Sequence, residues 1–410
     1  MSEMLPFHGL LPQEKKAPQV SAVPYDVVNT EEAAKLAAGN PLSFLRVSRP
    51  EIELPAGTDI HSEEVYDAAS ENFARLCAEA PLSLDKHSHL YVYTLKMGEH
   101  IQTGLAGAVS VEDYKKDIIK KHEKTRQDKE DDRTRHLLAT HSHTGPVFLT
   151  YKDLAEIDAL ISEISAGKPL FDFVAPDGIS HRLWRASVPK SSSLAGLFRD
   201  KVPCMYIADG HHRAAAAVRA AAECRKANHR HTGKEDYNYF LAVAFPASQL
   251  RIMPYNRVVK DLNGLSPDAL FAAIEKNFTL SKAESPSPAK PGEICMYING
   301  KWQKLSPKFD TASLDVISRL DVSILQDKVL SPILGIDDPR TSKRIDFVGG
   351  IRGTGELERL VNGGKAALAF SMYPTSVAQL MDIADAGAIM PPKSTWFEPK
   401  LRDGLVCHNF

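Results

Sequence analysis

The segment from residue 205 to residue 217 constrains this chain more than any other. It begins as a short apolar strand, residues 205–208, which runs into a turn at Gly210 and then into an alanine-rich helix. A strand that turns directly into a helix leaves the turn at the helix N-terminus, beside free backbone N–H groups and the positive end of the dipole. The run Asp209-Gly210-His211-His212-Arg213 therefore predicts an anion site at the start of this helix.

Composition limits the classes of function. A length of 410 residues suggests two or three domains, and a formal net charge of −2 argues against a general nucleic-acid or membrane-surface role. No apolar run approaches the roughly 20 residues that span a bilayer, and the N-terminus does not resemble a signal peptide. Five scattered cysteines suit a reducing cytoplasm and offer no thiolate zinc site. We therefore expect a cytoplasmic protein that binds neither membranes nor nucleic acid.

A second charged run covers residues 113–136. One interpretation is a solvated helix with ion pairs between residues four apart. The other is that its cations bind a phosphorylated ligand, because arginine forks suit phosphate oxygens and lysine adds point charge. The candidate side chains are those of Lys121, His122, Lys124, Arg126 and Arg133.

Three further segments carry expectations about local structure. Asp26 ends an extended segment before a helix for which Asn29 or Thr30 is the cap, so it is either a turn aspartate or a catalytic acid. Residues 43–47 predict a strand. Residues 349–355 are rich in glycine and predict a flexible turn. Their spacing does not match the dinucleotide-binding fingerprint, so we assign no dinucleotide site there.

The proline-stiffened run from residue 390 to residue 400 has two interpretations. In the first it is a rigid docking tail with Trp396 and Phe397 as anchors. In the second its polar residues return to the site that carries Arg213, and these are Lys393, Ser394, Thr395 and Lys400.

Strands outnumber regular βαβ repeats, so we expect mixed sheets with helices, α/β to α+β, rather than a doubly wound fold. A linker-like stretch at residues 284–292 and a change of texture near residue 262 indicate where domains divide. The expected parts are residues 1–262, a C-terminal α+β domain at 263–389, and a tail at 390–410 that folds back on the first part.

Four separate runs resemble the bacterial family catalogued as domain of unknown function 1015, over about residues 6 to 408. They are Pro24-Tyr25-Asp26-Val27, Lys121-His122-Glu123-Lys124-Thr125 with Arg133, Asp209-Gly210-His211-His212-Arg213, and Met390-Pro391-Pro392-Lys393-Ser394-Thr395. Where that family usually has a histidine in a Leu-Pro-Thr-His-Arg run, this chain has Asn256, so we assign no base there.

The strand that ends in Asp-Gly-His-His-Arg is also similar to the phosphate-binding turn of the ParB and sulfiredoxin superfamily. That superfamily includes nucleotide-binding partition proteins, sulfiredoxin, and kinases that phosphorylate free serine. The resemblance implies a ParB/sulfiredoxin-like core in which Gly210 allows backbone approach and His211, His212 and Arg213 hold phosphate. It also implies an upstream acid that assists catalysis, for which Asp26 and Glu123 are the candidates.

The leading hypothesis is a phosphotransferase that uses ATP or ADP with Mg²⁺ and acts on a small hydroxyl compound such as serine. Asp209 would bind Mg²⁺ or orient His211, and Asp26 or Glu123 would act as the base. The candidates for phosphate binding are Gly210, His212, Arg213, Lys121, His122, Lys124, Thr125, Arg126, Arg133, Lys393, Ser394 and Thr395. One alternative is a phosphatase for a phosphomonoester such as phosphoserine. The other is a non-catalytic, nucleotide-switched binding protein that forms a homodimer.

Overall fold

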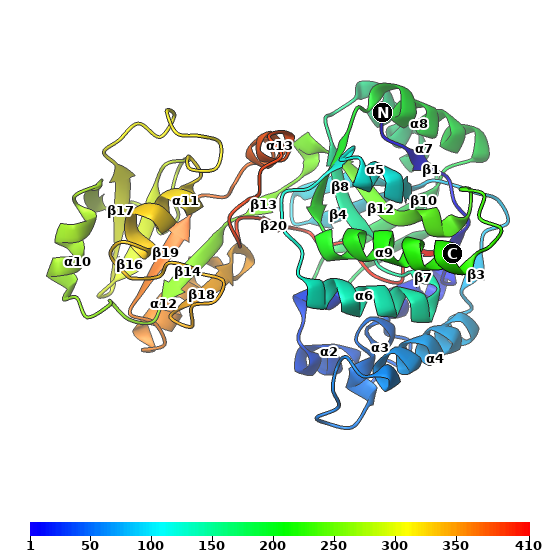
Figure 1. Cartoon of the computed structure of the whole chain (residues 1–410), viewed down its shortest axis with the longest axis horizontal. Coiled ribbons are helices and arrows are strands. Elements are labelled where there is room, and N and C mark those ends of the chain that lie inside the picture. Colours follow the sequence, from blue (N-terminus) through cyan, green and yellow to red (C-terminus); the bar gives the residue numbers. More distant parts are fainter. The chain divides into compact units, whose positions relative to one another are not determined.

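The computed structural model describes residues 1–410, which divide into two compact units (Figure 1). Unit 1 comprises residues 1–250 together with 399–410, and unit 2 comprises residues 251–398. The chain changes unit at residue 250, before the predicted division at 262, and it re-enters unit 1 at residue 399 rather than 390. Both units combine sheets with helices, so the predicted mixed fold class is confirmed.

Unit 1 is built on a nine-stranded mixed sheet in the order β6-β11-β8-β12-β5-β4-β10-β9, with β1 paired to β5. The pairs β11–β6 and β12–β8 are parallel, and the other pairs are antiparallel. The strands are β1 (Met4–Leu5), β4 (Tyr91–Met97), β5 (His100–Ser110), β6 (Ile119–Lys120), β8 (Val147–Tyr151), β9 (Phe171–Val174), β10 (Ser180–Arg185), β11 (Met205–Asp209) and β12 (Tyr239–Pro246). Residues 240–246 are all buried because both faces of β12 are covered.

Helices α7 (Ala155–Ser165), α8 (Val188–Lys201) and α9 (His211–Ala227) contribute to the same apolar core as this sheet. Five alanines of α9 are buried there, at positions 214, 216, 217, 220 and 221, and their small side chains let the helix approach β8 and β12 closely. On its outer side, α9 packs along α6 (Gln127–Thr140), and α4 (Glu63–Glu79) packs against α6 (Figure 1). No helix of the chain combines the length and the apolar character that a bilayer crossing requires.

A second core of unit 1 forms around Phe44, between α2 (Thr30–Ala37), α3 (Leu45–Ser48) and α4. Asn29 caps α2 in a capping box with Glu32. The predicted strand at residues 43–47 was wrong, because these residues form α3 and its preceding turn. Their apolar side chains are buried among helices and pair with no neighbouring strand, so packing overrides β propensity.

A four-stranded sheet in the order β3-β2-β21-β7 joins the beginning and the end of the chain. Its strands are β2 (Gly9–Leu11), β3 (Ser83–Leu84), β7 (Ser142–His143) and β21 (Cys407–Asn409). In this sheet Gly9 pairs with His408, and His408 pairs with His143. The last residues of the chain are thereby part of the unit 1 framework.

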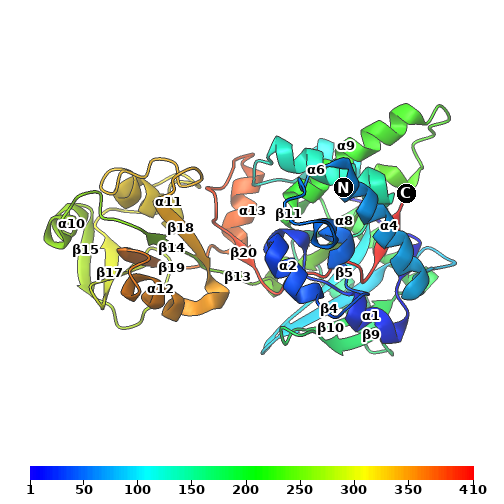
Figure 2. The ribbon, with the colours of Figure 1, turned by 90° about the horizontal axis from the view of Figure 1, so that it is seen from below.

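Unit 2 contains a six-stranded antiparallel sheet in the order β15-β17-β16-β19-β14-β18 and a short β13–β20 ladder (Figure 2). Its strands are β13 (Ile252–Met253), β14 (Tyr255–Val259), β15 (Phe278–Lys282), β16 (Ile294–Ile298), β17 (Lys301–Pro307), β18 (Ile345–Gly349), β19 (Leu368–Met372) and β20 (Trp396–Phe397). Its helices are α10 (Pro267–Ile274), α11 (Asp321–Leu325), α12 (Gly353–Asn362) and α13 (Val377–Asp385).

The predicted flexible turn at residues 349–355 was also wrong. A short 3₁₀ turn, Gly350–Arg352, leads into α12, which starts at Gly353. The helix forms in spite of its glycines because Leu357 and Leu360 bury their side chains in the unit 2 core.

Gly404 holds the C-terminal segment against the second core. Its φ of +79° is left-handed, and an added Cβ would lie 2.3 Å from a ring atom of Phe44. We predict that Gly404→Ala lowers the free energy of unfolding by about 2–4 kcal/mol, because backbone strain and overpacking act together. Urea denaturation followed by circular dichroism measures the loss.

The matched control for this variant is Gly178→Ala. Gly178 has a similar φ of +80°, but nothing lies within 4 Å of an added Cβ, so only the backbone term remains. Equal losses in the two variants would contradict a tight contact between the C-terminal segment and Phe44.

Candidate functional site

The turn between β11 and α9 has the geometry that the sequence predicts. Gly210 adopts a left-handed conformation with φ 92° and ψ 31°, which side chains other than glycine rarely allow. An added Cβ would also lie 3.0 Å from Nε of Arg213. The N–H of Ala214 donates to the carbonyl of Gly210 at 3.0 Å, so the three preceding N–H groups lie before the first intrahelical bond. The turn thus offers backbone donors to an anion.

The carboxylate of Asp209 is fixed from two sides. Its Oδ2 accepts a hydrogen bond from Nζ of Lys400 at 2.6 Å, and its Oδ1 accepts one from the N–H of Gly210 at 2.9 Å. Burial by itself would raise the pKa of Asp209, but the charges of Lys400 and Arg213 outweigh burial and hold that pKa well below its usual range. Asp209 is therefore an ionised carboxylate at any physiological pH.

The buried guanidinium of Arg213 connects three segments of unit 1. It donates to the carbonyl of Pro146, and its Nη2 lies 3.8 Å from Oδ2 of Asp26. Burial disfavours the charged form, but Asp26, Asp209 and Asp403 raise the pKa of Arg213 above its usual range. Arg213 is therefore a fixed positive charge directly behind the turn.

His211 and His122 bring two sequence motifs together. Their rings contact each other edge to face, with the ring centroids 4.4 Å apart, and Nδ1 of His211 lies 3.6 Å from Oε2 of Glu123. Burial lowers the pKa of His122 to about 4 and places the pKa of His211 well below 6.5. Both imidazoles are neutral at pH 7, so they offer hydrogen bonds without positive charge. Their ligand atoms and that of Glu123 lie within 4.8 Å of one another, close enough to hold a metal ion.

The charged run at residues 113–136 is not a single helix. It consists of α5 (Val111–Lys115), β6, a loop at residues 121–126, and α6. Within the loop, Lys121 donates to the carbonyl of Tyr114 at 3.0 Å, and the side chain of Arg126 pairs with Asp128 at 2.7 Å. The hydroxyl of Thr125 donates to Glu130. Lys124 is exposed and forms no ion pair, so it is the loop cation best able to meet a ligand.

The loop nevertheless adjoins the turn through its backbone. The N–H of Arg126 donates to Nε2 of His212 at 3.1 Å, and the N–H of His122 points at Nε2 of His211 at 3.5 Å. The loop at residues 121–126 and the turn between β11 and α9 therefore lie side by side. His212 serves as an acceptor in this contact, which fixes the loop beside the helix N-terminus.

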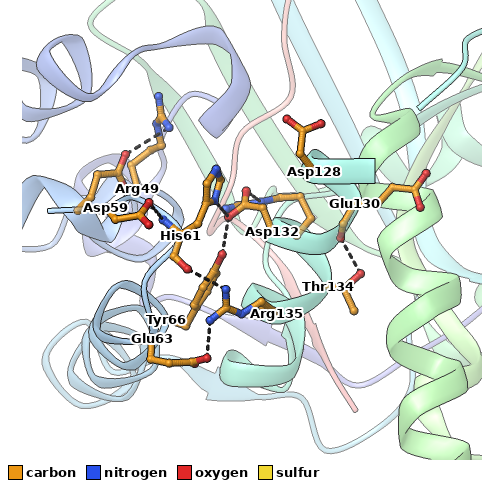
Figure 3. A network of polar contacts seen from close by, with 12 residues as sticks. Arg49, Asp59, His61, Glu63, Tyr66, Asp128, Glu130, Asp132, Thr134 and Arg135 are labelled. Carbon is orange, nitrogen blue, oxygen red and sulfur yellow. Dashed lines mark hydrogen bonds and ion pairs between the residues drawn. The ribbon is translucent and has the colours of Figure 1, made fainter. Parts of the chain in front are cut away.

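Figure 3 shows a polar network around Asp132, the residue that precedes Arg133 in the chain. Asp132 accepts from the hydroxyl of Tyr66 at 2.9 Å, lies 3.4 Å from Nδ1 of His61, and accepts from Nε of Arg133 at 2.9 Å. The guanidinium of Arg133 stacks on the ring of Tyr25, 4.1 Å from the ring centroid. Arg133 thus holds the short turn Tyr25–Val27, and with it Asp26.

A small polar pocket lies behind this turn, with Tyr25, Arg133, Arg213 and Asp403 among the residues of its wall. About 30 Å³ is open to the centres of water molecules, which suits a few waters rather than a nucleotide. Oδ1 of Asp403 is buried without a hydrogen-bond partner. Burial raises the pKa of Asp403 to about 7, in spite of the opposing charges of Arg213 and Arg133.

The remaining predicted residues, Lys393, Ser394 and Thr395, belong to unit 2. Ser394 is buried and donates to the carbonyl of Pro391 at 2.6 Å. Lys393 is exposed, and its Nζ lies 5.5 Å from the ring centroid of Tyr255. Their predicted role beside Arg213 stays a prediction. Asn256, the departure from the family pattern, is buried and accepts from the N–H of Met372 at 3.0 Å, which is a structural contact.

Two groups that contribute to the site were not predicted from the sequence. Asp403 lies opposite Arg213 although 190 positions separate them along the chain, and the carbonyl of Pro146 has no side-chain signal at all. Lys400 was expected to return to the site that carries Arg213, and its ammonium pairs with Asp209 in the same turn. Lys400 and Asp403 lie close together in the C-terminal segment. A cation and an acid at this short spacing were the sequence signal that could have indicated a contribution of this segment to the site.

We predict that Asp403→Asn stabilises the protein more at pH 8 than at pH 4. The pKa of Asp403 is about 7 in the folded state, above the ordinary value for an aspartate of about 3.9, so the folded state binds more protons between these two pH values. Stability is then lost as pH rises through this window. The free energy of unfolding of Asp403→Asn relative to that of wild type should rise by roughly 2–4 kcal/mol between pH 4 and pH 8.

Urea denaturation at several pH values measures this difference. Asp67→Asn, at an exposed position of α4, is the matched control and should show no comparable trend. A difference between Asp403→Asn and wild type that stays constant with pH would contradict the raised pKa of Asp403.

Comparisons of the whole fold found distant likenesses. A conserved hypothetical protein from Pyrococcus furiosus is 13% identical with a TM-score of 0.35, over 73% of this chain and 93% of that chain. A free serine kinase in complex with AMP is 12% identical with a TM-score of 0.37, over 71% and 86%. SbnI with C-terminal truncation from Staphylococcus aureus is 12% identical with a TM-score of 0.39, over 73% and 85%. These values are too low to carry an argument about function.

The comparison by sequence is more decisive. No curated protein matches this chain. One family model does match, over residues 4–323, and it is described as a protein of unknown function, DUF1015. This match spans the Asp26 turn, the loop at residues 121–126 and the β11–α9 turn, three of the four runs that carried the resemblance. The chain belongs to the family of proteins of unknown function DUF1015.

Proposed function

We propose that this chain is a nucleotide-dependent phosphotransferase that acts on a small hydroxyl metabolite such as free serine. The observation that carries the proposal is the left-handed turn at Gly210. The three N–H groups that precede Ala214 are unpaired there, and the charged guanidinium of Arg213 lies next to the carboxylate of Asp26. Phosphoryl transfer needs oxygens positioned, charge neutralised and a base near the hydroxyl, and this turn supports all three.

The phosphate oxygens would meet the backbone N–H groups at the start of α9. Gly210 lets the guanidinium of Arg213 lie against the backbone of the turn, because a Cβ at this position would stand 3.0 Å from Nε of Arg213. The exposed ammonium of Lys124 in the adjoining loop would add positive charge from the solvent side. The neutral imidazoles of His211 and His122 would contribute hydrogen bonds only.

Asp26 is our choice for the general base. Its side chain is 35% exposed, so a small hydroxyl compound can reach it, and Arg213 holds it at 3.8 Å. Glu123 is the second candidate, because its carboxylate lies 3.6 Å from Nδ1 of His211 at the other end of the same surface.

Mg²⁺ would supply neutralisation of the phosphate charge. Asp209 does not fit such an ion in the arrangement described, although a single carboxylate beside phosphate oxygens is the usual manner of Mg²⁺ binding. Both carboxylate oxygens already accept hydrogen bonds, from Lys400 and Gly210, so the ammonium of Lys400 occupies the position of the nearest cation.

The direct test incubates the purified protein with ATP or ADP, Mg²⁺ and a panel of hydroxyl amino acids, serine first. Phosphate that appears on an amino acid supports the proposal. Free phosphate released from phosphoserine supports a phosphatase in its place. Nucleotide binding that changes the oligomeric state without turnover supports a binding protein. Absence of both turnover and nucleotide binding overturns the proposal.

For the base, we predict that Asp26→Asn lowers kcat by about 10²- to 10⁴-fold, because the amide cannot accept the substrate proton. The KM for nucleotide should change little, since Asp26 does not touch phosphate in this proposal. Steady-state kinetics measures both. Asp67→Asn is the matched control and should keep full activity. If kcat of Asp26→Asn stays within twofold of wild type, Asp26 is not the base.

For the phosphate side, we predict that Lys400→Met raises the KM for nucleotide by about tenfold. Without its ammonium, the charge of Asp209 is neutralised less and repels the phosphate groups. Thermal shift with ADP and steady-state kinetics measure the effect. Lys115→Met, at an exposed position of α5, is the control. An unchanged KM would show that Asp209 lies outside the nucleotide site.

A further inference from the structure

Two neighbouring strands of the unit 1 sheet end beside each other and are followed by three side chains that can bind a metal ion. The strands β6 and β11 pair in parallel, so they end at the same edge of the sheet. His122 and Glu123 follow β6, and His211 is the first residue of α9 after β11. The topology therefore brings the three side chains together, although 89 positions separate the two histidines.

The spacing of the three side chains suits the ligands of one ion. Ligand atoms of His122, Glu123 and His211 lie within 4.8 Å of one another. Nδ1 of His211 lies 3.6 Å from Oε2 of Glu123. This separation is long for a hydrogen bond, which spans roughly 2.7–3.2 Å. Two ligands that stand about 2.1 Å from one tetrahedral ion lie roughly 3.4 Å apart, which is close to the observed separation.

The buried ring of His122 has one nitrogen available for an ion. Its Nδ1 is buried without a hydrogen-bond partner. The ring forms a hydrogen bond with the carbonyl of Ile207, and this bond belongs to Nε2 because Nδ1 has no partner. With the proton on Nε2, the lone pair of Nδ1 is unsatisfied in the interior, which is unfavourable. A backbone carbonyl that binds the other nitrogen is typical of a histidine that ligates a metal.

The surroundings of His211 allow its Nδ1 to act as a ligand. Coordination through Nδ1 places the proton of this neutral ring on Nε2. The N–H of His122 stands 3.5 Å from Nε2, at the long limit of a hydrogen bond, so it opposes that proton only weakly. Both histidines can therefore offer a lone pair to the same ion.

The ligand types indicate which metal would bind. Two imidazole nitrogens and one carboxylate oxygen form a set that Zn²⁺ and similar transition metals prefer, whereas Mg²⁺ and Ca²⁺ prefer oxygen ligands alone. Three protein ligands leave a fourth position open, as in catalytic zinc sites. The side chain of Glu123 is 58% exposed, so solvent reaches this side of the cluster.

We propose that His122, Glu123 and His211 hold one Zn²⁺ ion at the turn that carries Gly210. The two imidazoles supply nitrogen ligands, Glu123 supplies an oxygen ligand, and water or a phosphate oxygen takes the fourth position. Ligands that share one ion stand at most about 4.2 Å apart, so the three side chains draw slightly together on binding. The ion lies on the surface where the proposed function places phosphate, but its binding does not require that activity.

Isothermal titration calorimetry of the metal-free full chain with Zn²⁺, in the absence of nucleotide, tests the site. Wild type should bind about one Zn²⁺ per chain at micromolar concentration. Glu123→Gln should weaken this binding roughly tenfold, and His122→Gln and His211→Gln should each weaken it roughly a hundredfold. Two matched controls at exposed positions, Glu64→Gln on α4 and His229→Gln in the loop after α9, should bind like wild type.

Co²⁺ in place of Zn²⁺ provides a second readout. Bound Co²⁺ should give the visible absorption bands of a tetrahedral ion, and Glu123→Gln should change them. If the variants of the buried histidines do not fold, as circular dichroism would show, Glu123→Gln decides because its side chain is exposed. The proposal is overturned if wild type binds no Zn²⁺ at micromolar concentration, if Glu123→Gln binds both ions like wild type, or if His229→Gln loses the binding.

The variant Asp26→Asn separates this site from the proposed function. It should lose phosphoryl transfer and still bind Zn²⁺ like wild type, because Asp26 is not a ligand. A wild type that binds Zn²⁺ through these residues but transfers no phosphate overturns the proposed function and supports the metal site. A wild type that transfers phosphate but binds no Zn²⁺ overturns the metal site alone.

Discussion

The buried guanidinium of Arg213 is the interaction on which unit 1 depends. A buried guanidinium needs acceptors or opposite charges close to it, and here they come from distant parts of the chain. Asp26 belongs to the N-terminal segment, the carbonyl of Pro146 precedes β8, and Asp403 belongs to the C-terminal segment. One side chain at the start of α9 thus fixes the three segments that surround the turn at Gly210.

The titratable groups around Arg213 divide into two kinds. Asp209 and Arg213 hold their charges firmly, whereas burial keeps His122 and His211 neutral and brings the pKa of Asp403 to about 7. Fixed charges suit a site that positions an anion, because they do not reorganise when the anion arrives. The neutral imidazoles lie behind this surface and connect the loop at residues 121–126 to the helix.

The sequence pattern predicted correctly the elements whose conformation depends on interactions between residues close together in the chain. The strand, the glycine turn and the alanine helix from residue 205 onward follow from propensity and capping, and the structure has them where the sequence places them. The pattern failed at residues 43–47, where burial among helices decides, and at residues 349–355, where two leucines draw a glycine-rich segment into a helix. Asp403 could not be assigned from sequence, because its environment comes from residues that lie hundreds of positions away.

The order of the segments along the chain has a consequence for synthesis. Unit 1 begins with the first residues, but β21 and Lys400 follow unit 2 in the chain. A ribosome therefore completes all of unit 2 before it releases the residues that complete the four-stranded sheet and neutralise Asp209. A chain that stops early carries the whole β11–α9 turn and still lacks Lys400 and Asp403, so an unfinished product has no assembled site.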